Sequence, residues 1–393
     1  MRKIKVLFPE VEAGLGHIMP LRSVYEVFNK KYGDKVDVIK LNYFKNTGYK
    51  KLDKFGEMLV NEVKAYSNNH FRGYFATKAC EFFGTTLSTV GTMIIKIPGS
   101  HIEGIKYMED INPDVVFSTH WATNYYAENM KNKPFTIMYC PDVIMNKLFM
   151  YHADLTLLSM KPGYDLAKRY KKYNDENLRL VPFLIRNEAY DIPTNKLSNR
   201  KQLNLPEDKF TITIAEGGYG IGRLKELCEK LTKEHLPLTI IAVCGKNEEL
   251  KEYLSALEVS KEVTFIPLGF TDKMLEYIAS SDLFLGKSGN IISEPTFFGI
   301  PSIITGFATT IERNIGNYYI NNVRSSIKEF DVDNIIRLIK EFINNPKLLE
   351  PYKNNAIAYH SNYGSEYTAD LIWEKIVERF PELLKEEVTQ WII

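Results

Sequence analysis

The chain has 393 residues, 45% of them hydrophobic, which is enough for two domains of ordinary size with cores of their own. Its 50 basic and 49 acidic residues nearly balance, which argues against a large nucleic-acid surface. The four cysteines form no C-x-x-C pair, so a zinc site or a disulfide framework is not indicated and a reducing cytoplasm fits best.

The N-terminal half alternates short apolar runs with segments of helical spacing, which predicts a parallel α/β sheet. The strands expected are Ile4–Phe8, Val36–Leu41, Asp114–Ser118, Phe135–Cys140, Leu155–Ser159 and Arg179–Pro182. The first residues enter a strand without the apolar core of a signal peptide, and the weakly charged stretch 84–95 is too short to span a bilayer. We therefore expect a soluble or peripheral protein.

The first expected strand leads into a loop over residues 9–17 that contains Gly14, Gly16 and His17, and a helix is expected from about Pro20. The two glycines would let the backbone approach a ligand closely, and a histidine titrates near neutral pH. The alternative is that His17 only caps the helix or fills a gap.

Residues 64–97 combine aromatic and basic side chains. At or near helical spacing the stretch carries Lys64, Phe71, Arg72, Tyr74, Phe75, Lys78 and Phe82. Such a stretch is suited to an anionic membrane surface or a lipid groove, but aromatic stripes at this spacing also form cores. Both readings remain open.

Two further polar positions follow expected strands. His120 comes two residues after Ser118, and Asp142 comes two residues after Cys140. Ligands of open α/β sheets bind at the carboxyl ends of the strands, so both are candidate site residues.

Residues 191–204 contain proline, asparagine and serine and suggest a linker between domains. A second strand series follows, expected at Phe210–Ala215, Leu238–Val243, Val263–Leu268, Leu283–Leu285 and just after Pro301. The first of these strands runs into a glycine cluster with Gly218, Gly220 and Arg223, which by itself is weak evidence for phosphate binding.

The most informative stretch is the tight polar turn Lys287–Asn290 between an apolar strand and a helix. Backbone N–H groups at the start of a helix can hold an anion, and Glu294, about one helical turn further on, could accept bonds from sugar hydroxyls. The alternative is an ordinary βαβ connection whose glutamate favours the first helical turn.

The order and spacing of these motifs resemble the donor half of GT-B glycosyltransferases. The resemblance is dense from Thr211 to Tyr319 and is closest to the group of monogalactosyldiacylglycerol synthases, processive diacylglycerol glucosyltransferases and MurG. It implies an α/β fold of two Rossmann-like, doubly wound domains facing a central cleft. Residues 1–190 would form the acceptor-side domain, 205–365 the UDP-sugar domain, and a last helix within 366–393 would pack back on the first domain.

The resemblance also implies roles. Backbone groups of 269–271 would read the base, Glu294 would hold the ribose, Glu312 and Asn317 the sugar, and the turn at Lys287 the diphosphate. The residues expected to bind substrate are Gly14, Gly16, Gly218, Gly220, Arg223, Gly245, Lys246, Asn247, Gly269, Phe270, Thr271, Lys287, Ser288, Gly289, Asn290, Ile291, Glu294, Glu312 and Asn317. His17 is the first candidate for the catalytic base, with Asp142 and His120 as alternatives.

The chain departs from the family pattern at four places. No histidine closely follows Asp142, Ile311 stands where glutamine is common, Asn290 replaces a second glycine, and Pro295 follows the glutamate. The first departure puts in doubt the acceptor and the catalytic relay, and the second puts in doubt one sugar contact. The last two favour a non-catalytic binding subunit.

The implied activity is inverting transfer of a hexose or N-acetylhexosamine from a UDP-sugar to a hydroxyl acceptor, with a lipid such as diacylglycerol expected. Alternatives are a UDP-sugar epimerase of the same fold and a non-catalytic sugar-nucleotide or lipid-binding subunit. No cofactor and no metal are expected, because a helix terminus and basic side chains can hold a diphosphate. Asp331 and Asp333 imitate a D-x-D metal motif but are better explained as a helix cap and a first-turn charge. The expected location is the cytoplasm, with attachment to the cytoplasmic membrane face left open.

Overall fold

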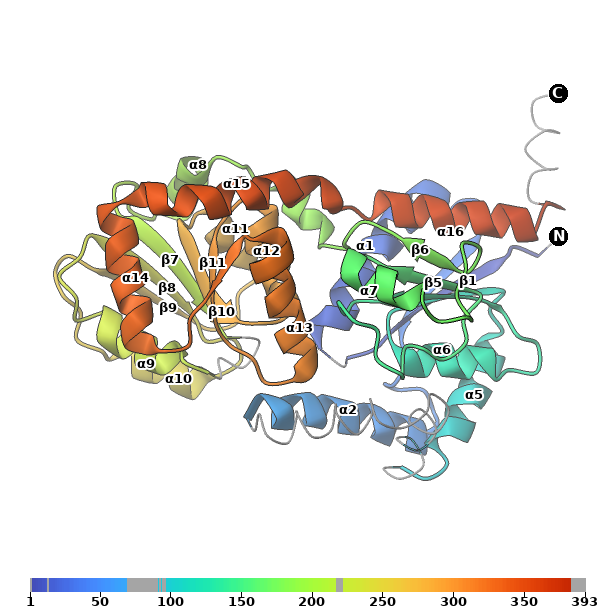
Figure 1. Cartoon of the computed structure of the whole chain (residues 1–393). Coiled ribbons are helices and arrows are strands. Elements are labelled where there is room, and N and C mark those ends of the chain that lie inside the picture. The colour runs from blue at the N-terminus through green and yellow to red at the C-terminus, as the bar shows by residue number, and fades with distance from the viewer. Residues whose placement is uncertain are drawn as a thin grey trace. The chain divides into compact units, whose positions relative to one another are not determined.

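A computed structural model describes residues 2–12, 14–68, 91, 93, 97–216 and 222–382 (Figure 1). The chain divides into two compact units. The first holds Met1–Val63, Phe75–Arg186 and Tyr363–Ile393, and the second holds Lys64–Tyr74 and Asn187–Asn362. Each unit is built around one parallel sheet.

The sheet of the first unit has the strand order β2-β1-β3-β4-β5-β6, with every neighbouring pair parallel. Its strands are β1 (Lys5–Glu10), β2 (Asp37–Asn42), β3 (Val115–Ser118), β4 (Phe135–Cys140), β5 (Leu155–Leu158) and β6 (Leu178–Leu180). Successive residues of one strand, such as Val116 and Phe117, enter separate buried clusters, so both faces of the sheet are covered. The strands expected from the sequence are therefore present, with shifts of one or two residues at their ends.

The helices of the first unit follow these strands. They are α1 (Leu15–Tyr32), α2 (Lys50–Asn68), α5 (Ser100–Ile111), α6 (Trp121–Glu128), α7 (Lys161–Ala167) and α16 (Glu366–Arg379). Helix α16, near the C-terminus, packs on α1, where the rings of Trp373 and Tyr32 stack with centroids 4.6 Å apart. Ala369, Ile372 and Ile376 of α16 join the same buried cluster as Phe8 and Phe28.

Helix α1 begins five residues before the position that the sequence suggested. The apolar residues at helical spacing begin at Leu21, and this pattern led to an expected start near Pro20. In the structure Gly14 has φ 106°, where a glycine is favoured, and Pro20 stands inside the helix. The loop expected over 9–17 is therefore shorter, since Pro9 and Glu10 end β1 and His17 lies in the first turn of α1.

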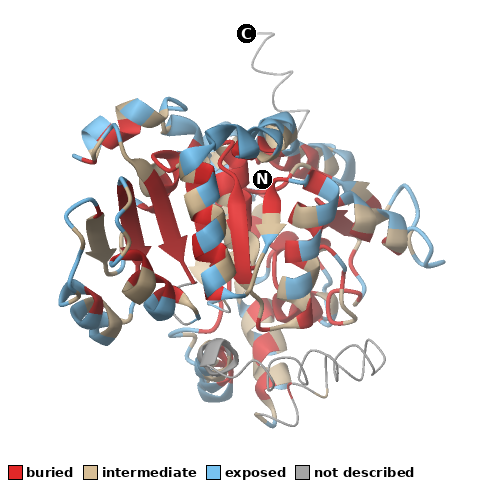
Figure 2. Ribbon diagram, turned by 60° about the vertical axis from the view of Figure 1, so that its left-hand side comes forward, coloured by how far each residue is buried: buried red, intermediate tan, exposed pale blue. Residues whose placement is uncertain are grey.

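The sheet of the second unit has the order β12-β11-β10-β7-β8-β9 and is also parallel throughout. Its strands are β7 (Phe210–Ala215), β8 (Leu238–Val243), β9 (Thr264–Leu268), β10 (Leu283–Lys287), β11 (Ser302–Gly306) and β12 (Ser326–Lys328). Strands β7, β8 and β10 are almost wholly buried, whereas the edge strand β9 is only half-buried (Figure 2). The apolar runs in the sequence are the inner strands.

The helices of the second unit are α8 (Lys196–Gln202), α9 (Leu224–Leu231), α10 (Glu248–Ser255), α11 (Met274–Ala279), α12 (Ser293–Phe297), α13 (Thr310–Tyr318), α14 (Val332–Asn344) and α15 (Glu350–Tyr359). Short 3₁₀ turns stand at η1 (Asn187–Asp191), η2 (Asn290–Ile292), η4 (Pro346–Leu349) and η5 (His360–Asn362), and a π-helical turn, η3 (Tyr319–Val323), extends α13.

Residues 191–204, which the sequence suggested as a linker between domains, include a short helix. They contain α8, which Asn195 caps by accepting hydrogen bonds from two backbone N–H groups. Arg200 of α8 is buried, and its guanidinium donates to the Asp282 carboxylate at 2.6 Å. This pair anchors the segment in the second unit, because a buried charge needs such a partner.

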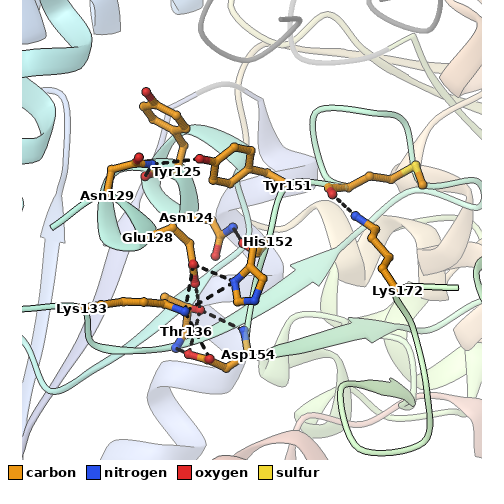
Figure 3. Close-up of polar contacts among 11 residues, drawn as sticks. Asn124, Tyr125, Glu128, Asn129, Lys133, Thr136, Tyr151, His152, Asp154 and Lys172 are labelled. Carbon is orange, nitrogen blue, oxygen red and sulfur yellow. Dashed lines mark hydrogen bonds and ion pairs between the residues drawn. The ribbon is translucent and has the colours of Figure 1, made fainter. Parts of the chain in front are cut away.

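A polar cluster lies at the amino ends of β4 and β5 (Figure 3). The Glu128 carboxylate, only 5% exposed, meets Lys133 Nζ at 3.0 Å and His152 Nδ1 at 2.7 Å. Asp154 accepts the backbone N–H of Thr136 at 2.9 Å, and the Thr136 hydroxyl donates to Glu128. The cluster ties the starts of two strands together at the end of the sheet opposite to the usual ligand edge. We interpret it as structural.

The basic and aromatic stretch proposed for membrane contact lies almost entirely outside the described residues. Phe71, Arg72, Tyr74, Phe75 and Lys78 are not described. Within the described part of the chain, no helix combines the length and the apolar character needed to cross a bilayer.

Asp331 caps α14, as the sequence predicted. Its carboxylate accepts the backbone N–H of Asn334 at 2.9 Å, whereas Asp333 lies on the surface beside Lys230. Asp331→Ala should therefore lower the free energy of unfolding by about 1 kcal/mol, measured by urea denaturation. Asp333→Ala is the matched control and should have a smaller effect, because exposed ion pairs contribute little. A larger loss for Asp333 than for Asp331 would contradict this assignment.

Candidate functional site

The turn after β10 is held to helix α13 by one carboxylate. Lys287 Nζ lies 2.9 Å from Glu312 Oε1, with the lysine side chain 11% exposed. The other Glu312 oxygen accepts the backbone N–H of Ala308, and the Ser288 hydroxyl donates to the Glu312 backbone carbonyl at 2.5 Å. Glu312, expected to hold a sugar, is thus already engaged with Lys287, expected to hold a diphosphate. The two candidate ligand groups are fixed side by side.

Gly316 permits this close packing. A Cβ atom at residue 316 would lie 2.8 Å from Ser288 Oγ, closer than real Cβ atoms come to other heavy atoms. Helix α13 can therefore rest on the turn only because residue 316 has no side chain. The sequence analysis did not single out this glycine, and its place in mid-helix was the available signal.

Glu216 is a second residue that the sequence analysis did not assign to the site. It directly follows β7 and is 3% exposed, and Thr305 at the end of β11 donates its hydroxyl to Glu216 Oε1 at 2.5 Å. Arg223 Nε donates to the Thr305 carbonyl at 3.2 Å. Burial raises the pKa of Glu216, while the Thr305 hydroxyl and the nearby Lys287 oppose the rise. An acid immediately after a predicted buried strand was the signal that could have revealed it.

These residues meet at one edge because β11, β10 and β7 are neighbours in the sheet. Their carboxyl ends bring together Thr305, Lys287 and Glu216 from three separate parts of the sequence. The edge carries two carboxylates, a lysine and an arginine, a set suited to polar, phosphorylated ligands.

The other expected donor residues lie at or near the same strand ends. Gly289 and Ile291 belong to the turn and to η2, with Asn290, and Glu294 lies in the short helix α12. Gly245 and Lys246 follow β8, and Asn247 caps α10 by accepting the Leu250 N–H at 3.0 Å. Gly269, Phe270 and Thr271 follow β9.

Four expected positions differ from the rest. Phe270 is 70% exposed, with Lys246 Nζ 6.0 Å from its ring centroid. Asn317 is exposed on α13, five residues beyond Glu312 and turned by about 140° from it around the helix axis. Gly218 and Gly220 lie outside the described residues.

In the first unit the structure brings His17 and His120 together. Their ring centroids are 5.0 Å apart, with the planes at 83°. His17 Nδ1 lies 2.8 Å from the Thr119 carbonyl oxygen, and His120 Nδ1 accepts the Ala122 N–H at 3.3 Å. Burial lowers the pKa of both rings, and the pKa of His120 is lowered further by His17. Both histidines are therefore neutral near pH 7, the form in which an imidazole can accept a proton. Gly14 is the N-cap residue of α1, and Gly16 directly precedes His17.

Asp142 lies at the carboxyl end of β4 and is not hydrogen-bonded to the paired histidines. Among the described residues its hydrogen-bond partner is the Asn146 side chain, at a long 3.5 Å, and no bond joins it to either histidine. Burial raises the pKa of Asp142 to about 7. It is a candidate proton acceptor only above that pH.

Metal binding has no support among the residues that the structure describes. No group of three or more histidine, cysteine, aspartate or glutamate side chains there is arranged to hold an ion. The absence of a metal from the proposed chemistry remains a prediction.

Comparison with known families and proteins agrees with this geometry. The family described as Glycosyl transferases group 1 matches residues 195–359, which include β7 to β12. The processive diacylglycerol beta-glucosyltransferase of Bacillus subtilis (strain 168) is 34% identical over 121 residues, 30% of this chain and 31% of that protein. Monogalactosyldiacylglycerol synthase 1, chloroplastic, of Arabidopsis thaliana is 21% identical over 346 residues, 82% of this chain and 61% of that protein. The match thus covers less than two thirds of either relative.

Solved structures show the same fold. MurG of Acinetobacter baumannii has a TM-score of 0.56 at 12% identity and covers 94% of this chain and 99% of its own. UDP-GlcNAc 2-epimerase from Neisseria meningitidis, bound to UDP-GlcNAc, has a TM-score of 0.57 at 13% identity and covers 96% of this chain and 100% of its own. The expected two-sheet architecture and the expected kinship are confirmed. The chain has the GT-B fold, residues 195–359 match the family of glycosyl transferases group 1, and its relatives include diacylglycerol glycosyltransferases.

Proposed function

We propose that the chain is an inverting glycosyltransferase that moves a hexose or N-acetylhexosamine from a UDP-sugar to a hydroxyl group, with a lipid such as diacylglycerol as the acceptor. The observation that carries the proposal is the fixed set of Lys287, Ser288 and Glu312 at the carboxyl edge of the second sheet. The family match over the same residues and the lipid-specific names of the relatives support it.

The proposed reaction assigns a task to each group. Lys287 and the backbone of the turn at Ser288 stabilise the negative charge that the UDP gains as the glycosidic bond breaks. Glu312 accepts bonds from the sugar hydroxyls, in an orientation set by Lys287 and Ala308. His17, whose pKa is lowered by desolvation so that the ring is neutral near pH 7, accepts the proton of the attacking hydroxyl. No metal is required, because the cationic side chain and the backbone N–H groups take its place.

The deciding experiment supplies the protein with UDP-glucose, UDP-galactose and UDP-GlcNAc, each with and without a mixed lipid extract. Mass spectrometry should find a new glycolipid, with UDP released only when lipid is present. A UDP-sugar epimerase, favoured by the likeness to the Neisseria meningitidis enzyme, would interconvert sugars without lipid. Tight UDP binding without turnover on any combination would instead indicate a binding subunit.

Glu294→Ala tests the proposed ribose contact. A carboxylate that accepts bonds from two ribose hydroxyls makes charge-assisted interactions, so the substitution should weaken UDP binding by ~1.5 to 3 kcal/mol in calorimetry. Glu341→Ala, on the surface of α14 in the same unit, is the matched control and should leave UDP affinity unchanged. Equal affinity of Glu294→Ala and wild type would remove Glu294 from the site.

A further inference from the structure

Two reciprocal hydrogen bonds join the turns that follow β1 and β3. His17 Nδ1 lies 2.8 Å from the Thr119 carbonyl oxygen, and the Thr119 hydroxyl donates to the His17 carbonyl at 2.7 Å. Thr119 is 1% exposed, so bulk water has little access to its hydroxyl and carbonyl groups. The two strands are parallel neighbours, which places their ends together.

The first bond fixes the tautomer of His17. A carbonyl oxygen only accepts hydrogen bonds, so the Nδ1 atom must carry the ring hydrogen. In the neutral ring the lone pair then lies on Nε2. His120 has the opposite arrangement, because its Nδ1 accepts the Ala122 N–H and its hydrogen therefore lies on Nε2. The neighbouring rings are neutral histidines of opposite tautomer.

Aromatic contacts hold the His17 ring on two further sides. Phe149 stacks on it with the planes at 13° and centroids 6.0 Å apart, and His120 meets it nearly at a right angle. A half-turn of the ring about its χ2 axis would exchange Nδ1 with a carbon atom and lose the bond to Thr119. The ring is thus fixed in both orientation and proton position.

We propose that Thr119 is the positioning residue that makes His17 a base at Nε2. The proposal rests on the transferase function proposed above. The acceptor O–H bond breaks and its proton moves to Nε2, while the acceptor oxygen forms a bond to the anomeric carbon of the sugar. The bond from that carbon to the UDP oxygen breaks, and UDP leaves with the electron pair. The imidazolium keeps its Nδ1–H on the Thr119 carbonyl, which stabilises the positive charge.

The tautomer can be measured without any activity. In protein labelled with ¹⁵N-histidine at pH 8, long-range ¹H–¹⁵N correlations distinguish protonated from bare ring nitrogens, and His17→Gln and His120→Gln assign the signals. His17 should be protonated at Nδ1 and His120 at Nε2. A neutral His17 ring protonated at Nε2 would overturn the inference, and one protonated at Nδ1 would support it. Both conclusions hold even if glycosyl transfer is never detected.

The role of the hydroxyl is tested with variants of Thr119. Thr119→Val keeps the shape and the backbone carbonyl that accepts the Nδ1–H but loses the hydroxyl that holds the His17 backbone. Nδ1 should therefore stay protonated, while kcat should fall ~10- to 10²-fold with UDP affinity unchanged, because the ring is no longer held in place. Thr119→Ser keeps the donor and should retain kcat. Thr239→Val removes a buried hydroxyl from the second unit and controls for a general loss of packing. A Thr119→Val protein with wild-type tautomer and wild-type kcat would show that the bridge is only structural.

Discussion

Replacing His17 with alanine should lower the turnover number by ~10² to 10⁴ and leave UDP affinity unchanged. The base contributes only to proton removal from the acceptor, while the residues proposed for UDP lie in the second unit. Steady-state kinetics and calorimetry on the same preparations would measure both quantities. His235→Ala, which removes an exposed histidine of the second unit, is the control and should change neither. Near-normal turnover of His17→Ala would remove it as the base.

The pH profile of the wild type gives an independent check. Burial lowers the pKa of His17, so the ring stays neutral below the ordinary histidine value of about 6.5. The acid limb of kcat should therefore lie below that pH. If Asp142 were the base, the limb would lie near pH 7, because burial raises its pKa to about that value. An aspartate with an ordinary pKa near 3.8 would give an acid limb below that of a histidine, and the burial of this carboxyl reverses the order.

Asp142→Asn should stabilise the protein at alkaline pH. The pKa of this carboxyl rises from an ordinary 3.8 to about 7 in the folded state. Between these values the folded state binds more protons than the unfolded state, so stability falls as the pH rises. At about 1.4 kcal/mol per pH unit, the cost of the ionised wild-type carboxyl approaches roughly 4 kcal/mol above pH 7. Asparagine resembles the protonated acid and carries no such cost.

Urea denaturation at several pH values would test this prediction. The stability difference between Asp142→Asn and wild type should be largest at pH 8 and shrink steadily toward pH 5. Asp208→Asn, at an exposed carboxyl, should show no such trend. A constant difference across the range would mean that the Asp142 carboxyl is hydrated or paired in solution. Retained glycosyl transfer by the same variant would also exclude Asp142 as the base.

The sequence by itself was enough to predict strands β1 to β11 and the fold class, but not the short edge strand β12. Apolar runs such as Leu238–Val243 and Phe210–Ala215 match β8 and β7 residue for residue, because inner strands of a parallel sheet are apolar on both faces. The Asp331 cap of α14 could also be predicted from the sequence, because its bonding partner, Asn334, is only three residues away. Patterns of this kind depend only on neighbouring residues, so they can be recognised without the tertiary structure.

Only the tertiary structure decided how the polar groups pair. His17 and Thr119 are 102 residues apart, and Glu216 and Thr305 are 89 residues apart, yet each pair is bonded because the sheet order makes their strands neighbours or near neighbours. The anchoring of α8 by Asp282 and the pairing of Lys287 with Glu312 have the same origin. The pKa of Asp142 depends on burial by distant segments. Strand order and burial are properties of the whole fold, and no local pattern of residues specifies them.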